Sequence, residues 1–182
     1  MNRSSKEVKS DLLFYFLYSR GFLYATTEMG TYDGYSFKAD IVAVNKNYKF
    51  YEVEIKTSFG DLKNELETID YITNNTEVKS NLAKYYKHKE YLKKTEHIER
   101  FIPHRFYFAL PYENKKYALE KLKNTPYGVM DLDGNVFKTA KDLHNRVIEK
   151  DFLEKMLQRL SRENYNLSKK YEMELSSKNE KS

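Results

Sequence analysis

The chain has 182 residues, enough for one domain with a buried core. Aromatic residues make up 15% and cysteine is absent, which argues against disorder and excludes disulfides and thiolate metal sites. The formal charge of +5 and the pI near 9.0 allow a polyanionic partner without requiring one. The longest apolar run, 12–18, is too short to cross a bilayer, and the polar N-terminus does not resemble a signal peptide. We therefore expect a soluble, cytoplasmic protein with no membrane partner.

Apolar periodicity and turn residues predict alternating helices and strands. Ser4 followed by Glu7 is a capping-box pattern, and Gly21 follows where the C-terminus of a helix often places glycine. Asp133-Gly134 predicts a type I′ turn between two short strands. In chain order we expect a helix at 4–20, strands at 22–28, 41–44 and 48–56, helical structure from an N-cap at Asp61 to about Lys94 with breaks near 72–77, a strand at 105–110, a helix at about 113–123, the hairpin, and a helix from about Lys141.

This order predicts an α/β protein with a mixed β-sheet flanked by helices. We expect residues 1–140 to form the domain and 141–182 to form a C-terminal helical extension with a polar tail. Apolar residues recur at four-residue intervals from Ile148 to Leu160. Such a helix suits two roles, covering the core of the domain or joining two copies of the chain as a homodimer.

The strand at 48–56 carries charged residues where a buried strand would be apolar. Alternate residues of a strand share a face, so Glu52, Glu54 and Lys56 point to one side. An edge strand with one solvated face would give the same pattern. An acidic residue followed two positions later by lysine also occurs five times in the chain, so the triplet alone does not identify a site.

Asp40, just before the apolar strand 41–44, gives the triplet a partner. A three-residue loop at 46–48 would place Asp40 directly opposite Glu54. A loop at 45–47 would place it opposite Glu52, with Glu54 on the diagonal. A two-residue loop would send Asp40 to the other face of the sheet.

Two carboxylates and a lysine on one face suit metal-dependent hydrolysis of phosphodiesters. Asp40 and Glu54 offer the oxygen ligands that Mg²⁺ or Mn²⁺ prefers. Such an ion polarises a phosphoryl oxygen and helps to generate a hydroxide nucleophile. Lys56 would orient the attacking water and offset charge on the phosphate.

These residues resemble the core of the PD-(D/E)XK nuclease superfamily, and within it the MmcB-type family of DNA-repair nucleases. The resemblance implies a restriction-endonuclease-like fold and a Mg²⁺-dependent endo- or exodeoxyribonuclease acting in DNA repair, recombination or the processing of mobile-element or phage DNA. The chain departs from the family pattern by the extra residues 66–86 and by His88 in place of an aromatic residue. The matching elements, within roughly 37–138, are Ala39-Asp40, Glu54-Ile55-Lys56, Asp61, 87–91 and 105–111.

The resemblance also suggests secondary candidates. It places Lys87 and His88 beside the site, where they would hold a substrate phosphate, although a solvated helix face is the alternative. Many members place an acidic residue of the first helix near the metal, and here Glu7 and Asp11 are the candidates. Glu52 would bind a second ion or pair with a lysine. No metal-ligand spacing relates His97, His104 and His144.

A catalytically silent nuclease-fold module that binds DNA is the alternative function. Loss of chemistry usually shows as a missing ligand or a missing lysine. Because Asp40, Glu54 and Lys56 are all present, the sequence favours the enzyme.

Overall fold

The computed structural model of this chain describes residues 3–30, 38–74, 82–93, 102–146, 148 and 150–179. The chain divides into two compact units, Met1–Ile148 and Glu149–Ser182. The predicted break in the helical stretch falls partly on 75–81, which lies outside the described residues, as does His97.

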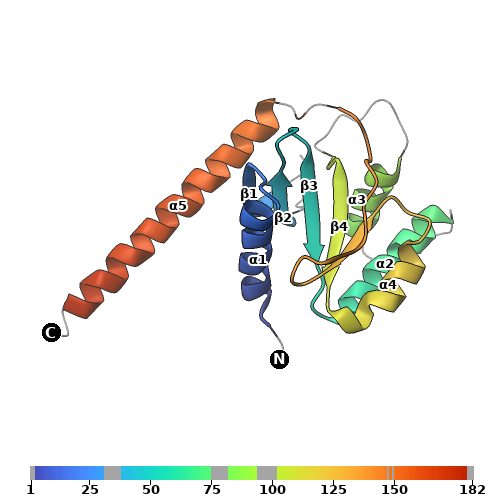
Figure 1. Cartoon of the computed structure of the whole chain (residues 1–182), viewed down its shortest axis with the longest axis horizontal. Coiled ribbons are helices and arrows are strands. Elements are labelled where there is room, and N and C mark those ends of the chain that lie inside the picture. The colour runs from blue at the N-terminus through green and yellow to red at the C-terminus, as the bar shows by residue number, and fades with distance from the viewer. Residues whose placement is uncertain are drawn as a thin grey trace. The chain divides into compact units, whose positions relative to one another are not determined.

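A six-stranded mixed sheet forms the centre of the first unit (Figure 1). The first three strands are antiparallel, the third to fifth are parallel, and the sixth is antiparallel to the fifth. The prediction of an α/β protein with a mixed sheet is therefore confirmed. In spatial order the strands are β1 (Tyr24–Gly30), β2 (Lys38–Val44), β3 (Phe50–Ile55), β4 (Arg105–Leu110), β5 (Gly128–Asp131) and β6 (Val136–Lys138).

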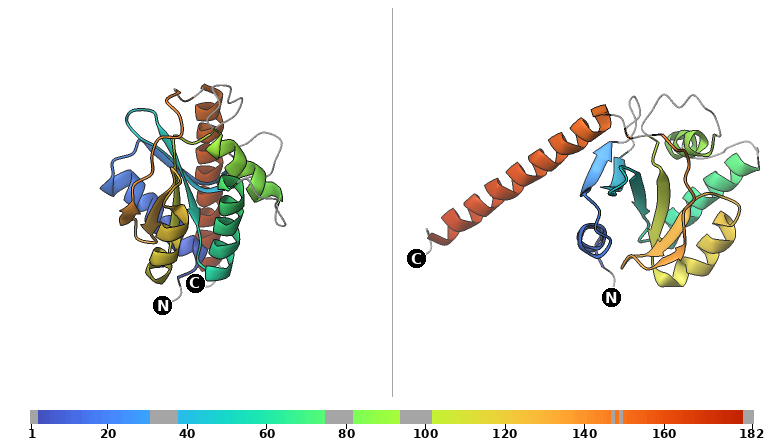
Figure 2. Two further views of the ribbon diagram at one scale, coloured as in Figure 1. Left: turned by 90° about the vertical axis from the view of Figure 1, so that its right-hand side faces the viewer. Right: turned by 45° about the horizontal axis from the view of Figure 1, so that its top comes forward.

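Helices cover both faces of this sheet. Figures 1 and 2 show α1 on one face and α2, α3 and α4 on the other. None of the helices in the described part of the chain is both long enough and apolar enough to span a bilayer. The helices of the first unit are α1 (Ser5–Phe14), which continues as a π-helical turn at Tyr15–Ser19, then α2 (Phe59–Thr73), α3 (Leu82–Leu92), and α4 (Lys115–Leu122) after a 3₁₀ turn at Tyr112–Asn114.

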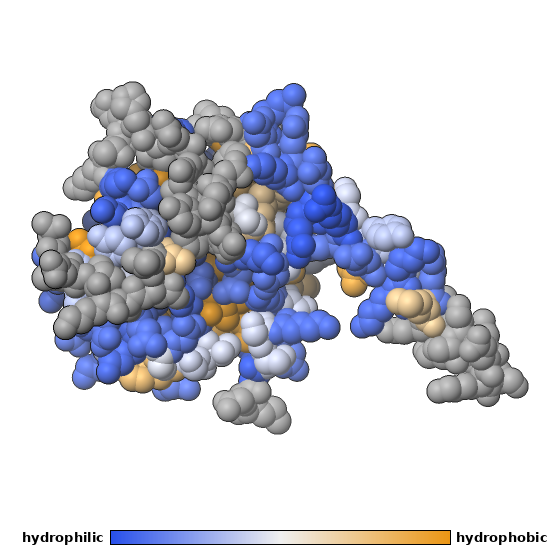
Figure 3. Space-filling model, turned by 180° about the vertical axis from the view of Figure 1, so that it is seen from behind, coloured by the Kyte–Doolittle hydropathy of each residue, from blue (hydrophilic) through white to orange (hydrophobic). Residues whose placement is uncertain are grey.

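Alternation along β3 divides its side chains between two layers. Tyr51, Val53 and Ile55 join the apolar layer that packs against α1. Glu52 and Glu54 therefore face the layer built with α2 and α3, where Leu62, Leu66, Ile69, Phe106 and Phe108 form the apolar core. The space-filling view in Figure 3 shows mainly hydrophilic side chains on the visible surface of the described residues. Glu52 of β3, by contrast, is a charged residue that is fully buried.

The ends of two helices follow from their caps. The predicted capping box of α1 is confirmed, because Ser4 and Glu7 each accept a hydrogen bond from the other's backbone N–H. The predicted N-cap at Asp61 is wrong. Ser58 caps α2 instead, since its hydroxyl oxygen accepts from the Asp61 N–H at 3.2 Å.

The predicted hairpin of β5 and β6 is confirmed, but its turn type is not. A type I′ turn requires positive φ at both central residues, and here only Gly134 has it, with φ of 90°. The carboxylate of Asp131 accepts from the N–H groups of Asp133 and Asn135, which builds a longer turn.

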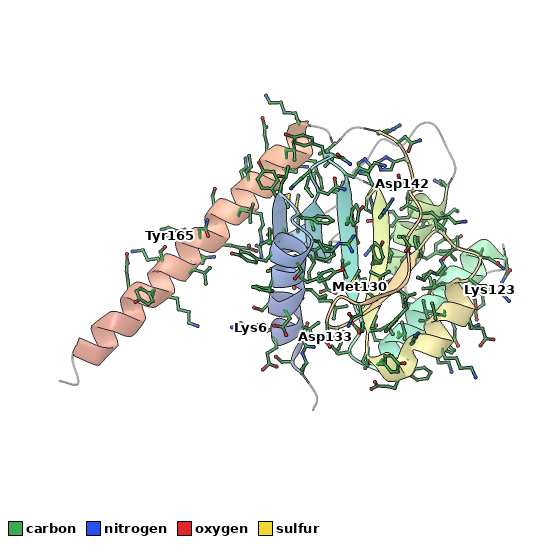
Figure 4. The ribbon with its side chains drawn as sticks, in the orientation of Figure 1. Lys6, Lys123, Met130, Asp133, Asp142 and Tyr165 are labelled. Carbon is green, nitrogen blue, oxygen red and sulfur yellow. The ribbon has the colours of Figure 1, made fainter. Side chains whose placement is uncertain are left out.

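The last helix, α5 (Lys150–Asn179), begins later than the predicted Lys141. Residues 141–146 lie along the first unit instead. The N–H of Lys141 donates to the Pro126 carbonyl, and Asp142, labelled in Figure 4, pairs with Arg105 at 2.6 Å and with Lys49. The Leu143 N–H also donates to the His104 carbonyl, so this segment is held by contacts within the first unit and helical structure starts only after it.

Candidate active site

The β2–β3 hairpin fixes the position of Asp40. Val44 pairs with Phe50, which leaves a three-residue loop at 46–48 between Asn45 and Lys49. One position beyond the Ile41–Val53 pair, Asp40 stands opposite Glu54. The structure therefore selects the first of the two predicted loops, and its register places Asp40 opposite Glu54.

Asp40 lies near the start of β2, within reach of α1. Its Oδ2 accepts the Ile55 N–H at 2.9 Å, and its Oδ1 lies 2.9 Å from the Lys9 ammonium. Lys9 also pairs with Glu28. Glu28 lies between the paired positions Thr27 and Met29 of β1, so it too stands opposite Asp40. Three acidic residues on adjacent strands thus form one row across the sheet, Glu28, Asp40 and Glu54.

Glu54 and Lys56 are in direct contact. The Lys56 ammonium lies 2.7 Å from Glu54 Oε1, 2.7 Å from Glu65 and 3.2 Å from Asp61, and its side chain is only 2% exposed. Asp61 and Glu65 are one turn apart on α2, and both also pair with Lys84 of α3. Lys56 is therefore held by β3 and α2 together.

Lys87 of α3 approaches the same carboxylate from the other side. Its ammonium lies 3.0 Å from Glu54 Oε2 and 2.6 Å from Glu52. Glu52 is fully buried, and it also accepts a hydrogen bond of 2.6 Å from the Tyr91 hydroxyl. Glu52 thus pairs with a lysine, the second of its two predicted roles.

His88 is also fully buried. Its Nε2 lies 3.0 Å from Glu65 and its Nδ1 lies 3.0 Å from the Tyr127 hydroxyl. In the tautomer with the proton on Nε2, the ring donates to Glu65 and accepts from Tyr127. Both ring nitrogens are then occupied, and Lys87 is turned inward. This geometry makes Lys87 and His88 supports of Glu54 and Glu65 and disfavours contact with a substrate phosphate.

The predicted acidic candidates of α1 lie elsewhere. Glu7 is used in the capping box, and Asp11 pairs with Arg3. The residue of α1 that reaches Asp40 is Lys9. The sequence analysis considered only acidic residues of this helix, so it did not predict the contact of Lys9 with Asp40. It also missed Glu65, although the four-residue spacing from Asp61 would have placed both on one helix face.

Electrostatics keep the central groups charged. Burial raises the pKa of Glu54, but Lys87 and Lys56 outweigh it, so this pKa lies below its usual value. Burial lowers the pKa of Lys56, but Glu65 and Glu54 hold it well above the usual value. Glu65 and Glu54 therefore favour the ammonium form of Lys56.

The donor set fits a hard divalent cation. Four carboxylates contact three ammonium groups around Glu54, and two carboxylates contact one ammonium group at Asp40, so each set has one carboxylate in excess. Asp40 and Glu54 contribute oxygens from neighbouring strands, and Mg²⁺ typically takes one or two protein carboxylates and keeps its waters. Among the described residues no group of three or more His, Asp or Glu is arranged as a preformed metal cage. The members of this carboxylate–lysine cluster are Glu28, Asp40, Glu52, Glu54, Asp61 and Glu65 with Lys9, Lys56, Lys84 and Lys87.

A separate cavity of about 810 Å³ lies at the C-terminal ends of α2 and α4 and includes none of these residues. Its lining contains Asp70 and Lys121, which pair with each other. It offers no convergent set of catalytic groups, so the carboxylate–lysine cluster is the candidate site.

Comparisons with known proteins identify a solved structure with a similar fold, but they do not indicate a function. No protein-family model and no curated protein matches the chain. A solved structure, a protein of unknown function from Silicibacter pomeroyi, is similar with a TM-score of 0.59 and 13% sequence identity. The similarity covers 92% of this chain and 94% of that one. At this identity it shows a shared fold only.

Proposed function

We propose that the protein is a cytoplasmic, metal-dependent deoxyribonuclease that hydrolyses DNA phosphodiester bonds in repair, recombination or the processing of mobile-element or phage DNA. The observation that carries the proposal is the register that sets Asp40 opposite Glu54, with Lys56 two residues later and in contact with Glu54. A restriction-endonuclease-like fold is part of the proposal. It is supported by a mixed sheet with α1 on one face and α2 on the other.

Each residue has a distinct role in this proposal. Asp40 and Glu54 would hold Mg²⁺ or Mn²⁺, which supplies Lewis-acid polarisation of the phosphate and acidifies a bound water. Lys56 stays protonated and offers N–H donors and positive charge where charge develops on the phosphate. Glu65, held by His88, keeps the Lys56 ammonium in place.

The test compares Asp40→Asn with Asp142→Asn. Both carboxylates are about one-quarter exposed and both pair with cations, but Asp142 lies outside the carboxylate–lysine cluster. Asparagine at position 40 can still accept the Ile55 N–H while losing the charge. Labelled single-stranded, duplex, flapped and branched DNA would be incubated with Mg²⁺, Mn²⁺ or EDTA.

We expect EDTA-sensitive cleavage that the Asp40→Asn protein loses and the Asp142→Asn protein keeps. Cleavage that survives Asp40→Asn would remove this residue from the chemistry. Cleavage that EDTA does not affect would contradict the proposed metal dependence.

A DNA-binding module without catalysis is the second candidate. The observation that favours it is that lysine ammonium groups already lie on both candidate ligands, Lys9 on Asp40, and Lys56 and Lys87 on Glu54. In this function the lysines would replace the metal as permanent counter-charges. Retarded migration of DNA in EDTA, with no cleavage of any substrate in Mg²⁺ or Mn²⁺, would support it.

We also propose that α5 joins two copies of the chain. Leu153, Leu160 and Leu167 recur every seven residues, and Leu157, Asn164 and Tyr171 interleave with them at the same period. This is the spacing of a two-stranded coiled coil, with leucine at one core position and a single asparagine at the other that sets the register. Leu157, Leu167 and Tyr171 are each more than half exposed on α5.

A further inference from the structure

Lys9 occupies the position on Asp40 that a metal ion would take. Asp40 uses Oδ2 to accept the Ile55 N–H, which ties it to the end of β3. Its other oxygen, Oδ1, faces only Lys9 among the contacts that the structure gives it. A cation that binds Asp40 through Oδ1 must therefore displace this ammonium group or share the oxygen with it.

Lys9 is also the easiest of the site's lysines to displace. Its side chain is 17% exposed, whereas those of Lys56 and Lys87 are 2% and 6% exposed. Lys56 and Lys87 each contact two or more carboxylates that are themselves buried, so moving either would leave buried charge unpaired. Both partners of Lys9 reach solvent, at 24% for Asp40 and 41% for Glu28.

Glu28 gives Lys9 a second partner to which it can retreat. It pairs with Lys9 and stands opposite Asp40 in the row across the sheet. Its backbone is left-handed, with φ of 54°, inside a strand, which costs a non-glycine residue roughly 1–2 kcal/mol. Strained residues of this kind persist where the surrounding structure holds them, often at functional sites.

We propose that Lys9 is a cation-responsive latch: it bridges Asp40 and Glu28 when no divalent ion is bound, and moves to Glu28 alone when an ion binds Asp40. This inference rests on the proposed metal site and concerns its regulation. Lys9 therefore competes with the metal, and Glu28 favours the metal by stabilising the retracted position of Lys9. The Asp40 carboxylate then loses its ion pair with Lys9 only when a divalent ion binds in its place.

The charges of Lys9 and Glu28 would affect cation binding even if Lys9 did not move. The test must therefore separate this direct electrostatic effect from the movement of Lys9. Removing any positive charge near a cation site favours the cation, and removing any negative charge opposes it. In a latch, however, Glu28 acts mainly through Lys9. Most of the effect of Glu28→Gln must then be lost in the Lys9→Met protein, whereas two independent charge effects would add.

The experiment measures the dissociation constant of Mn²⁺ alone by the electron paramagnetic resonance signal of the free ion. The proteins are the full chain, Lys9→Met, Glu28→Gln, the double variant, and Asp40→Asn as the negative control. Lys6→Met is the matched control, because Lys6 lies one turn before Lys9 on α1 and is exposed (Figure 4). Circular dichroism of each protein verifies the fold, and Lys9→Gln repeats the measurement with a polar side chain.

We expect Lys9→Met and Lys9→Gln to bind Mn²⁺ about tenfold more tightly, within the range of roughly 5- to 150-fold seen for coupled sites. Glu28→Gln should weaken binding several-fold, and the double variant should match Lys9→Met. Lys6→Met should change binding less than about twofold at physiological ionic strength, where exposed charges are screened.

Two results would overturn the latch while leaving the metal site intact. One is that the full chain binds Mn²⁺ and Lys9→Met does so no more tightly. The other is that Glu28→Gln has the same effect with and without Lys9. If no variant binds Mn²⁺, including Lys9→Met, the latch and the proposed metal site fail together.

Discussion

Lys87→Met tests whether the carboxylate–lysine cluster holds the first unit together. The Lys87 ammonium is 2.6 Å from Glu52 and 3.0 Å from Glu54, and it lies between them in the layer next to α3. Methionine keeps most of the side-chain volume and removes the charge. Glu52, which is fully buried, would then lose its ion pair and keep the hydrogen bond from the Tyr91 hydroxyl.

Removing one partner of a buried ion pair typically costs about 3–5 kcal/mol, because the other charge stays buried without compensation. That loss is a large part of the roughly 5–15 kcal/mol by which domains are usually stable. At about 2–4 °C per kcal/mol, the melting temperature should fall by roughly 6–20 °C. Urea unfolding followed by circular dichroism, in EDTA at pH 7, gives the free energy of unfolding.

The control is Lys89→Met, two residues further along α3. Lys89 is exposed, and its ammonium lies 5.4 Å from the centre of the Tyr85 ring. Its loss should change stability by no more than about 1 kcal/mol. The double variant Lys87→Met/Glu52→Gln should recover most of the lost stability, because the unpaired charge is gone. If Lys87→Met is as stable as Lys89→Met, or if the double variant loses the sum of the single losses, the reasoning is refuted.

Three further predictions concern other parts of the chain. Gly134→Ala should lower the free energy of unfolding by roughly 2 kcal/mol in urea titrations, because an added Cβ would lie 2.6 Å from the Tyr15 ring at a φ of 90°; an unchanged midpoint would contradict the turn geometry. Burial lowers the pKa of His104 from 6.5 to about 4, so the unfolded chain takes up this proton first, and the stabilisation present above pH 6.5 should fall by about 1–3 kcal/mol toward pH 4. His104→Asn should lack that part of the pH dependence, and an identical pH profile would count against it. In sedimentation equilibrium Leu167→Lys should be monomeric, whereas Tyr165→Lys, similarly exposed on α5 (Figure 4) but outside the seven-residue repeat, should remain dimeric; equal behaviour of the two would argue against the coiled coil.

The sequence alone predicted the structural features that depend on residues close together in the chain. β4 was predicted with its observed bounds, because the apolar run at 105–110 ends at Pro111. The grouping of Asp40 with Glu54 follows from strand alternation and a short loop, both of which are local. The cap of α2 was missed because Ser58 and Asp61 are both good N-caps, and only the backbone geometry distinguishes them.

The contacts that complete the candidate site come from residues far apart in the sequence. Lys9 and Asp40 are separated by the rest of α1 and the whole of β1, and Lys56 meets Glu65 only because α2 folds back on the sheet. No local pattern specifies how helices pack on a sheet, so the sequence predicted Lys56 and Lys87 but missed Lys9 and Lys84, which also pair with carboxylates of the site. The start of α5 was misplaced for a related reason, since residues 141–146 form long-range contacts that helical periodicity does not reveal.

The distribution of charge in the layer beside α2 and α3 argues for a function at this end of the sheet. Most of that layer is apolar, with Leu62, Leu66, Phe106 and Phe108 all fully buried. Replacing buried ion pairs by well-packed apolar residues is often neutral or stabilising, so the fold alone does not require the charged residues. They are concentrated where β2 begins and β3 ends, and around Glu54 four carboxylates face three ammonium groups. A local departure from the packing rules that otherwise hold throughout the layer is what a functional site produces. The excess of carboxylates agrees with the cation site that we propose.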